Sequence, residues 1–469
     1  MNFSNKKVLI MGLGLHGGGV EDALFFIKEG ADVTVTDLKT RKKLRKSIEK
    51  LEQYEVSYTL GEHKDEDFKN ADIVIKNPGV PQDSYFIKIA KKRGAAIYDS
   101  MGIFFQYADI QKMIGVTGTK GKSSTSTLIH EALKTKYPDA YITGLPGSSP
   151  LSIASDVKNS YGVIELSSWR LEGINPIEKS PHIAVITNIQ EDHLNRYKSY
   201  EAYRKAKEII FKFQNENDFL VLNYDDEYLR NIAVSAPSKV FFYSAQTKPE
   251  TSKGEKGNIN TGAYIRKNKL YIGKKKIGDI GELGLDQQTQ HIDNVLATIT
   301  VANLLDLDIK KTTEAIVSFK GLPGRLEHVG TLDQIDLYND TTATNPYAVT
   351  NSLKKFKNKK VGLILGGEDK KLDYAPLVPY LKDTHSIALL PGSASVKIDR
   401  EIKKDTLELL NIKKTATLRE AIWWNYANKP DVILLSPGAA SFNMFKNEFD
   451  RGDEFKRIAT EVGNILKPK

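Results

Sequence analysis

A glycine-rich loop with two lysines and two serines carries the most specific chemistry in this sequence. The segment TGTKGKSS follows an apolar run and precedes a stretch of helix-forming residues. Backbone amides of such a loop bind phosphate oxygens, the ammonium of Lys122 neutralises them, and a serine hydroxyl can coordinate Mg²⁺. The strict phosphate-loop pattern requires glycine where this chain has Val116, but the strand–loop–helix context still predicts an ATP-type site. The predicted nucleotide contacts are Gly118, Thr119, Lys120, Gly121, Lys122, Ser123 and Ser124.

Two further residues suit a divalent cation beside bound phosphates. Glu165 ends the apolar run in VIELSS, and His193 follows the apolar run that ends in TNI. A hard cation takes oxygen ligands and an occasional imidazole, and ligands gather at the carboxyl ends of strands in open sheets. Taken singly, each residue also has a structural explanation, a helix cap for Glu165 and an exposed loop position for His193. Lys207, by itself, has the features of a solvated lysine on a helix.

A second glycine loop lies near the N-terminus. GLGLHGGG at residues 12–19 follows a predicted strand and precedes a predicted helix, and Asp37 ends the next predicted strand. Free amides and the helix dipole at such a position favour an anion. The loop departs from the dinucleotide-binding pattern, so a tight turn without a ligand remains an alternative.

The elements that must position these residues alternate between strand and helix. We predict strands at residues 6–14, 31–37, 71–80, 95–100, 112–117, 161–168, 182–189, 218–226, 336–341, 359–367, 385–392 and 431–441. We predict helices at residues 20–30, 122–133, 200–213 and 290–307, and a polar loop at 247–262 followed by a surface hairpin. Strands alternating with helices indicate parallel sheets with helical crossovers, so the fold class is α/β.

Composition limits the classes of function. A chain of 469 residues exceeds a single core and favours about three domains. It has no cysteine, which excludes disulfides, thiolate metal sites and cysteine nucleophiles. No apolar run is long enough for a membrane span, so we expect a cytoplasmic protein with no membrane partner. The net charge of +9 suits anionic ligands, but the lysines are scattered, which disfavours nucleic acid as a partner.

In their order along the chain, the motifs resemble those of the Mur ligases. The matching segments cover nearly the whole chain and are GLGLHG, TGTKGKSS, ELSSWRLE, TNIQEDHLNRY, YRKAK, HIDNVLA, GLPGRLE, YNDTTATN and LLSPGAASFNMFKNEFDRGDEF. ELSSWRLE and SPGAASFNMFKN most resemble the members that add D-glutamate. The resemblance implies a Rossmann-like UDP-sugar domain at residues 1–108, a central P-loop ATPase-type ligase domain at 109–321 and a C-terminal Rossmann-like amino-acid domain at 322–469.

The resemblance also implies a reaction. In this family ATP converts a carboxylate into an acyl phosphate, and an amine then displaces phosphate to form an amide. Phosphorylation gives a poor electrophile a good leaving group, while Mg²⁺ and lysine absorb the developing charge. The implied substrates are UDP-N-acetylmuramoyl-L-alanine and D-glutamate, the implied cofactors are ATP and Mg²⁺, and the implied setting is cytoplasmic peptidoglycan precursor synthesis by a monomer.

Site residues follow from the resemblance position by position. The implied catalytic set is Lys122, Glu165, His193, Lys207 and Asp340. The implied Mg²⁺ ligands are Ser123, Glu165, His193 and Lys207, the last as a carbamate, and further nucleotide contacts are Asn294, Arg325 and Asp340. The implied acceptor contacts are Leu15, His16, Asp37 and Leu38, and the implied amino-acid contacts are Thr344, Ser441 and Phe442.

Several positions depart from the family pattern, mostly in the substrate pockets. Lys120 replaces the usual asparagine, Thr342 replaces a carboxylate-binding lysine, Gly324 replaces a histidine, and Glu448 precedes the aromatic Phe449. We hypothesise that Lys120 or another cation compensates for the lysine missing at position 342. Amide ligation is therefore predicted more firmly than D-glutamate. A related ligase using L-glutamate or aspartate stays open, as does a non-catalytic nucleotide-binding protein, which the retained catalytic residues disfavour.

Overall fold

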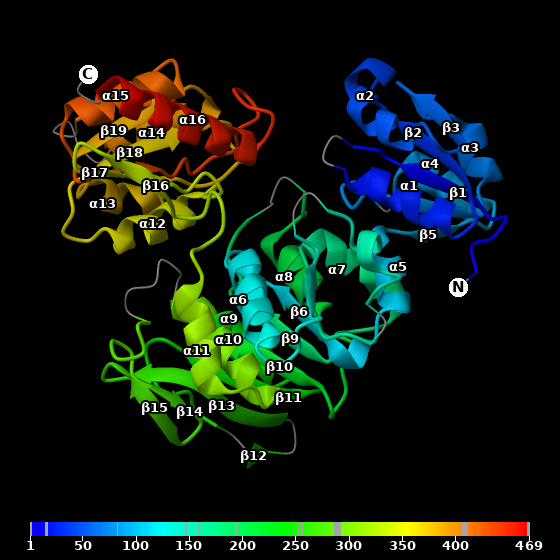
Figure 1. Ribbon diagram of the computed structural model, residues 1–469, viewed down its shortest axis with the longest axis horizontal. Coiled ribbons are helices and arrows are strands. Elements are labelled where there is room, and N and C mark those ends of the chain that lie inside the picture. Colours follow the sequence, from blue (N-terminus) through cyan, green and yellow to red (C-terminus); the bar gives the residue numbers. More distant parts are fainter. Residues whose placement is uncertain are drawn as a thin grey trace. The chain divides into compact units, whose positions relative to one another are not determined.

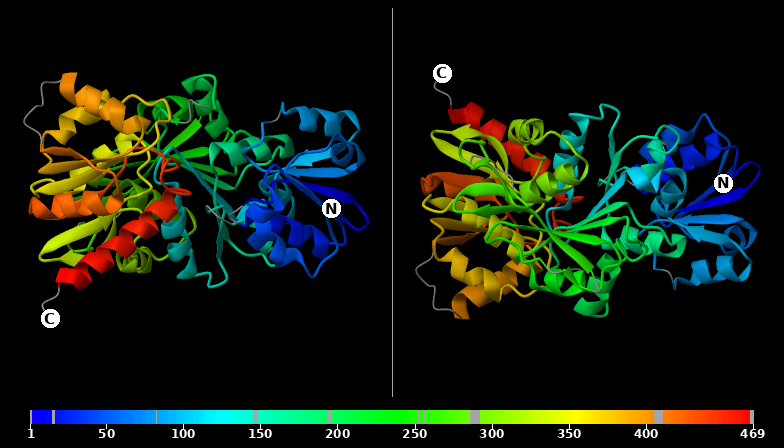
Figure 2. Two further views of the ribbon diagram at one scale, coloured as in Figure 1. Left: turned by 90° about the horizontal axis from the view of Figure 1, so that it is seen from above. Right: turned by 90° about the horizontal axis from the view of Figure 1, so that it is seen from below.

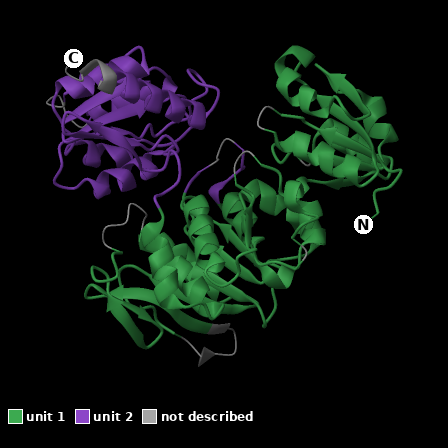
Figure 3. Cartoon of the chain, viewed as in Figure 1, with its two compact units in different colours: residues 1–190, 201–319 green, residues 191–200, 320–469 purple. Residues whose placement is uncertain are grey.

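The computed structural model contains three β-sheets, each with helices packed against it (Figures 1 and 2). It describes residues 2–14, 17–81, 83–145, 148–157, 159–192, 196–251, 253–254, 257–285, 292–404 and 411–466. Two compact units divide the chain, residues 1–190 with 201–319 and residues 191–200 with 320–469 (Figure 3). The first two sheets belong to the first unit and the third sheet belongs to the second.

The first sheet is parallel throughout, with strand order β3-β2-β1-β4-β5. Its strands are β1 (Lys7–Met11), β2 (Asp32–Asp37), β3 (Val56–Leu60), β4 (Ile73–Lys76) and β5 (Ala96–Tyr98). Its helices are α1 (Gly18–Lys28), α2 (Arg41–Ile48), η1 (Glu49–Leu51), α3 (Asp65–Asn70), α4 (Tyr85–Lys92) and α5 (Ser100–Tyr107). The chain reverses its direction of travel across the sheet between β1 and β4, so the carboxyl ends of these two strands flank a crevice where ligands of such sheets bind.

The second sheet has the order β15-β14-β13-β11-β10-β9-β6-β8-β7, with β12 paired to β13. Its strands are β6 (Met113–Thr117), β7 (Tyr141–Thr143), β8 (Gly162–Glu165), β9 (Ile183–Ile186), β10 (Phe219–Asn223), β11 (Lys239–Ser244), β12 (Lys253–Gly254), β13 (Gly257–Arg266), β14 (Lys269–Ile272) and β15 (Lys275–Asp279). Its helices are η2 (Ile110–Lys112), α6 (Lys122–Lys134), η3 (Pro150–Ile153), α7 (Ser168–Ile174), η4 (Asn175–Ile177), α8 (Tyr200–Glu208), α9 (Glu227–Ala233), α10 (Ile292–Leu304) and α11 (Ile309–Ser318). Strands β6, β8 and β9 are buried on both faces, which explains their unbroken apolar sequences.

The predicted polar loop at residues 247–262 is wrong in its second half. Strand β13 begins at Gly257 and pairs in parallel with β11, which sequence patterning had not predicted. The predicted hairpin follows as β13, β14 and β15, but it continues the main sheet through antiparallel pairing. The strand was missed because the segment is polar in composition. Its pairing partner, β11, lies outside the segment, so local patterning could not indicate the strand.

The third sheet has the order β16-β17-β21-β18-β19-β20, antiparallel between β16 and β17 and parallel elsewhere. Its strands are β16 (Glu327–Leu332), β17 (Ile335–Asn339), β18 (Val361–Gly366), β19 (Ser386–Leu390), β20 (Ile412–Lys414) and β21 (Val432–Leu435). Its helices are α12 (Pro346–Lys355), η5 (Ala375–Leu377), α13 (Val378–Leu381), α14 (Ser393–Lys404), α15 (Leu418–Ala427) and α16 (Glu448–Leu466). Because β21 lies between β17 and β18, the loops that follow these three strands meet at one edge of the sheet.

The α/β fold class is confirmed, with two open sheets on either side of the central one in sequence. The boundaries predicted after residues 108 and 321 stay predictions. Among the described residues, no helix combines the length and apolar character needed to cross a membrane.

Candidate active site

The glycine loop has the geometry that phosphate binding requires. It leaves β6 at Thr117 and enters α6 at Lys122, with Gly121 as the N-cap in a left-handed conformation (φ 84°). Gly118 also has a positive φ of 147°, and a Cβ there would collide with the hydroxyl of Thr187. Only glycine therefore fits at position 118, since the backbone is both left-handed and in close contact with the neighbouring chain.

The segment after β9 holds this loop in place. The amide of Thr119 donates to the carbonyl oxygen of Asn188 at 2.8 Å, and the amide of Lys120 donates to Asn188 Oδ1 at 3.0 Å. The hydroxyl of Thr187 donates to the carbonyl oxygen of Lys120 at 2.5 Å. The amides at the start of α6 are those that the helix itself leaves for an anion.

Two lysines converge on the carbonyl of Gly118. Lys122 donates through Nζ to the carbonyl oxygens of Gly118 and Thr119, both at 3.0 Å. Lys207 donates to the same Gly118 oxygen at 2.8 Å, is only 1% exposed and lies over the Tyr203 ring at 4.8 Å. The solvated character that its local sequence suggested is wrong, because α8 turns this residue into the core beside the loop. Two cations beside a phosphate-type loop favour the binding of a polyphosphate.

Glu165 places a carboxylate next to the same glycine loop. It ends β8 and pairs in register with Val116 on β6, so it lies alongside the start of the loop. It is 5% exposed, and its Oε2 has no hydrogen-bond partner among the described residues. A buried carboxylate oxygen without a partner is costly, and a bound cation would satisfy it.

The donor set around the loop fits Mg²⁺. Ser123 and Ser124 are buried at the start of α6, and together with Glu165 they offer the hard oxygen atoms that this ion prefers. Within the described part of the chain, no group of three or more histidine, aspartate or glutamate side chains forms a ready metal cluster. His193, the predicted second ligand, lies outside the described residues.

Asn294 contacts the same loop from α10. Its Oδ1 accepts a hydrogen bond from the Thr125 hydroxyl at 3.1 Å, and a Cβ at Gly121 would lie 2.6 Å from that oxygen. The side chain is buried. The helix thus brings a polar amide to the beginning of α6, next to the predicted phosphate site.

On the first sheet, Asp37 fixes the N-terminal glycine loop. Its Oδ2 accepts from the amide of Gly14 at 3.1 Å and its Oδ1 from the amide of Lys39 at 2.8 Å. Leu38, beside it, is exposed, whereas Leu15 and His16 lie outside the described residues.

In the second unit, Asp340 is buried in a network of donors. Its carboxylate accepts from Ser352 at 2.6 Å, from Ser436 at 2.8 Å and from the amide of Leu326 at 3.3 Å. Burial raises the pKa of Asp340 to about 6. Because Leu326 directly follows Arg325, the carboxylate holds the segment from which Arg325 projects.

Two departures from the family pattern are linked in space. The hydroxyl of Thr342 donates to the carbonyl oxygen of Gly324 at 2.9 Å. Gly324 has a φ of 70°, and a Cβ there would lie 2.8 Å from Cγ2 of Thr341. A histidine at position 324 would therefore not fit this conformation, and Thr342 is bonded to the same turn through its hydroxyl and its amide.

The residues predicted to contact the amino-acid substrate lie on loops at the edge of the third sheet. Thr344 follows β17, and Ser441 and Phe442 follow β21. Ser441 is buried with a hydroxyl that has no partner among the described residues, while Phe442 is 70% exposed. An unused buried hydroxyl beside an exposed aromatic ring is consistent with a ligand contact.

Sequence reasoning missed Lys370. Its Nζ donates to the Thr344 hydroxyl at 3.0 Å and lies 3.8 Å from Oδ1 of Asp192. This side chain is 19% exposed and follows the glycine pair that ends β18. The sequence feature that could have identified Lys370 is its position shortly after a buried strand and two glycines. It brings a cation to the loop in which Thr342 lacks one.

The site residues thus fall into two sets, each described within its own unit. The first unit brings together the loop at residues 118–124 with Glu165, Lys207 and Asn294. The second unit brings together Thr344, Ser441 and Phe442 with Lys370, and it also holds Arg325 and Asp340. A phosphate loop with a buried acid and lysine, on a three-sheet α/β scaffold, defines an enzyme class that handles a nucleoside triphosphate.

Comparison with known proteins narrows this class. Residues 116–302 match the family model for the Mur ligase middle domain, and residues 6–99 match that for the MurD-like N-terminal domain of Mur ligases. Two curated relatives named UDP-N-acetylmuramoylalanine–D-glutamate ligase come from Borreliella burgdorferi strain B31 (34% identical, covering 98% of both chains) and Roseiflexus sp. strain RS-1 (36% identical, covering 98% of this chain and 99% of the relative). The chain therefore belongs to the Mur ligase family, on the branch of the D-glutamate ligases.

Solved structures share the fold. The UDP-N-acetylmuramate–alanine ligase MurC from Thermotoga maritima aligns over 97% of this chain and all of its own, with a TM-score of 0.60 and 18% identity. The MurF ligase from the same organism, solved in complex with ADP, aligns over 92% of this chain and 96% of its own, with a TM-score of 0.56 and 17% identity.

Proposed function

We propose that this chain is the ATP-dependent ligase that adds D-glutamate to UDP-N-acetylmuramoyl-L-alanine during peptidoglycan precursor synthesis. The observation that carries the proposal is the buried Oε2 of Glu165 beside the loop at residues 118–124, which has no hydrogen-bond partner in the part of the chain that the structure describes. That site occurs in a chain that matches D-glutamate ligases along 98% of its length.

The reaction follows from the needs of amide formation. An oxygen of the alanyl carboxylate attacks the γ-phosphorus of ATP, and the bond to the bridging oxygen breaks to release ADP. The glutamate nitrogen attacks the acyl carbon, loses a proton, and the carbon–oxygen bond to phosphate breaks. Positioning and charge neutralisation are the protein's main contributions to phosphoryl transfer.

The residues of the first unit would divide this work. Lys122 and the amides at the start of α6 hold phosphate oxygens, and Asn294 contacts the nucleotide. Mg²⁺ bound by Ser123, Glu165, His193 and carbamylated Lys207 would neutralise the charge that develops on the transferred group. Lys207 already meets the loop at Gly118, and a carbamate would convert this donor into an acceptor for the cation.

The residues of the other sheets would hold the remaining groups. Asp37 orders the N-terminal glycine loop, where Leu15, His16 and Leu38 contact the uridine part of the acceptor. Arg325 contacts the nucleotide, with Asp340 fixing its segment. Thr344, Ser441 and Phe442 contact the incoming amino acid. We further propose three functional domains at residues 1–108, 109–321 and 322–469, and a monomer that works in the cytoplasm, where ATP is available.

Lys370 is the proposed cation for the glutamate side-chain carboxylate. Its hydrogen bond to Thr344 brings it to the loop of the missing lysine, whereas Lys120 belongs to the other unit. Lys370 therefore fulfils the expected compensation better than Lys120 does. The linked changes at Gly324 and Thr342 also keep a second candidate open, a ligase for L-glutamate or aspartate.

Oxygen labelling tests the proposed reaction. The acceptor is prepared with ¹⁸O in its alanyl carboxylate and incubated with protein, ATP, Mg²⁺ and D-glutamate. Because one carboxylate oxygen leaves with phosphate, mass spectrometry should find one ¹⁸O atom in the released phosphate. Unlabelled phosphate alongside amide product would contradict the acyl-phosphate route.

A further inference from the structure

The chain passes from the first sheet to the second by one covalent connection. The last strand of the first sheet is β5, the first strand of the second is β6, and α5 and η2 lie between them. Helix α5 packs against α7, so the connection itself is anchored on the side of the second sheet. Regions joined in this way move relative to each other unless further contacts hold them. Contacts that bypass the connection therefore decide how firmly the two sheets are joined.

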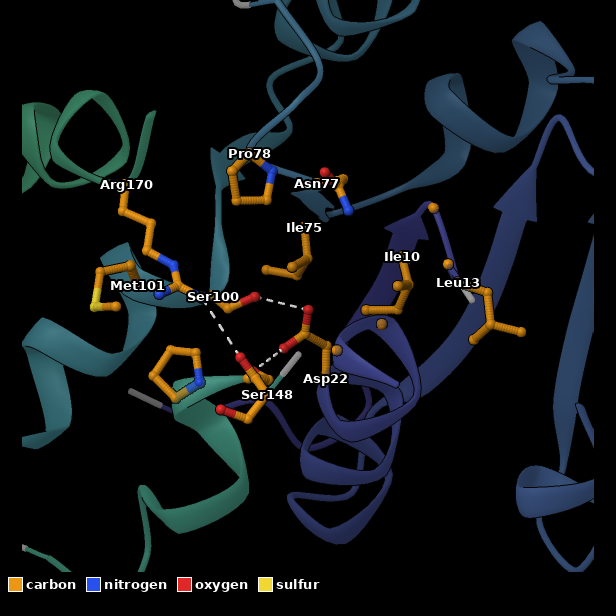
Figure 4. Close-up of a pocket in the computed structure, with 16 residues that line it drawn as sticks. Ile10, Leu13, Asp22, Ile75, Asn77, Pro78, Ser100, Met101, Ser148 and Arg170 are labelled. Atoms are coloured by element: carbon orange, nitrogen blue, oxygen red, sulfur yellow. Dashed lines mark hydrogen bonds between the residues drawn. The ribbon is translucent and has the colours of Figure 1, made fainter. Parts of the chain in front are cut away.

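One such contact joins α1 of the first sheet to the segment that precedes η3 of the second. The amide of Ser149 donates to Glu21 Oε2 at 2.5 Å, and its hydroxyl donates to Asp22 Oδ1. The other carboxylate oxygen of Asp22 accepts from the Ser100 hydroxyl, at the start of α5, at 2.7 Å. Figure 4 shows Asp22 between Ser100 and the segment of Ser148, beside a cavity of about 180 Å³. Two adjacent acids of α1 thus hold one residue of the second region.

The surroundings of this contact make its hydrogen bonds strong. Asp22, Ser100 and Ser149 are all buried. Burial raises the pKa of Asp22 to about 6, so at pH 7 its carboxylate is ionised and accepts from both hydroxyls. Hydrogen bonds to an ionised acceptor are stronger than neutral ones, and the low dielectric of a buried site strengthens them further. The hydroxyl oxygen of Ser149 also accepts from the amide of Leu151 at 3.1 Å, which fixes the start of η3.

The segment between β7 and η3 also contacts the proposed metal ligand of the second sheet. Gly144 directly follows β7, and a Cβ at this position would lie 2.3 Å from the carbonyl oxygen of Glu165. The same segment therefore lies against the backbone of Glu165 near its beginning and is bonded to α1 at Ser149. A displacement of α1 relative to the second sheet would act on the segment that lies against Glu165.

We propose that Asp22 is a positioning residue that, together with Glu21, fixes the first sheet to the second through Ser149. These three residues are called the α1 clasp. The catalytic consequence rests on the proposed function, which places the acceptor on the first sheet and ATP on the second. The acceptor carboxylate and the γ-phosphate react only in close contact, and a misplacement of about 1 Å lowers such a rate by about 100-fold. The clasp keeps the two substrates in register.

Electron paramagnetic resonance tests the α1 clasp directly. The chain has no cysteine, so Lys43→Cys on α2 and Lys310→Cys on α11, both at exposed positions, provide the only sites for spin labels. We expect a narrow distribution of distances between the two labels, and one at least twice as wide after Ser149→Ala. The matched control is Ser386→Ala, which removes a buried hydroxyl that donates to Asn425 at 2.6 Å within the second unit. It should leave the distribution unchanged, and an equally narrow distribution after Ser149→Ala would overturn the proposal.

Steady-state kinetics tests the catalytic consequence. Ser149→Ala should lower kcat for the D-glutamyl product at least tenfold, while the KM for ATP stays within twofold because the nucleotide site is intact. Its melting temperature should fall by no more than that of Ser386→Ala, since each variant loses one buried serine hydroxyl. Ser149→Thr keeps the hydroxyl and should recover most of the turnover. An unchanged kcat despite a wider distance distribution would contradict the positioning role.

The two measurements separate the α1 clasp from other roles of Ser149. If Ser149 acts by touching a ligand in the neighbouring cavity, Ser149→Ala changes the kinetic constants while the distance distribution stays narrow, which would also overturn the proposal. If wild-type protein makes no D-glutamyl product but Ser149→Ala still widens the distribution, the proposed function fails and the α1 clasp stands.

Discussion

At the scale of single residues, Glu165 is the buried acid next to the phosphate-type loop. One of its oxygens is buried without a hydrogen-bond partner among the described residues, and the residue pairs with Val116 on the strand that leads into the loop. Such an arrangement costs folding stability and is typical of functional positions. The same carboxylate becomes useful when a cation is bound.

Replacement of this carboxylate should separate activity from stability. We expect Glu165→Gln to lower kcat at least about 100-fold, because the charge that holds the cation is lost. The melting temperature should stay equal or rise, since a buried charge is removed. Steady-state kinetics and thermal melting measure the two effects, with the exposed Glu178→Gln as control. Near wild-type turnover would contradict the role of Glu165.

Lys370 is the residue on which the amino-acid preference should depend. Lys370→Met should raise the KM for D-glutamate at least tenfold, because a buried carboxylate that loses its cation costs roughly 2–5 kcal/mol. The exposed neighbour Lys371→Met serves as control. Thr342→Lys should leave the glutamate KM near wild type if Lys370 compensates, and a large gain in affinity would show that no compensation exists.

Asp22 should produce a specific pH dependence of stability. Burial raises its pKa to about 6, above the ordinary value near 4. Between these values the folded protein keeps a proton that the unfolded chain releases, so the free energy of unfolding falls as the pH rises through this window. Relative to Asp22→Asn, wild type should lose up to about 3 kcal/mol between pH 4 and pH 7.

Urea unfolding of the two proteins across this pH range measures the difference. The exposed Asp83→Asn should show no comparable trend. A difference between wild type and Asp22→Asn that stays constant with pH would contradict the buried position of this carboxyl.

At the scale of elements, the junction between β6 and α6 depends on glycine at position 118. Gly118→Ala combines a left-handed backbone with a collision against Thr187. We expect a loss of at least about 2 kcal/mol in unfolding free energy and much weaker ATP binding, because the loop must move. Denaturant unfolding and nucleotide titration test this expectation. Gly18→Ala has open space at its Cβ and is the matched control, and equal behaviour of the two variants would contradict the strained geometry.

The elements also show how far sequence reasoning reaches. The glycine loops and Glu165 could be predicted because each directly follows an apolar strand, and strand ends are visible in the sequence. Lys370 could not be predicted, because its importance comes from its hydrogen bond to Thr344, which is distant in sequence and follows another strand of the same sheet. The start of β13 was missed for the same reason, since its partner β11 lies across a polar segment.

The departures at Gly324 and Thr342 illustrate the same limit. In the sequence they are two separate substitutions, whereas in the structure the hydroxyl and the amide of Thr342 both donate to the carbonyl oxygen of Gly324. The motif order predicted the family correctly along the whole chain. The details of the amino-acid pocket needed the third sheet to be assembled.

At the scale of the whole molecule, the three sheets each place proposed ligand-binding residues at the carboxyl ends of their strands. The first sheet presents a glycine loop and a cavity, the second a phosphate-type loop with its acid, and the third a cation and an unused hydroxyl. Parallel α/β sheets bind ligands at these ends, and one reaction with three substrates would use all of them. The net charge of +9 suits substrates that are all anionic.

The most direct test of this account is product formation by the purified protein. ATP, Mg²⁺ and UDP-N-acetylmuramoyl-L-alanine are incubated with D-glutamate, L-glutamate, aspartate or no amino acid, and phosphate release and product mass are recorded. We predict phosphate release that depends on D-glutamate and a product heavier than the acceptor by one glutamyl residue. Release that depends on another amino acid, or no release with any of them, would contradict it.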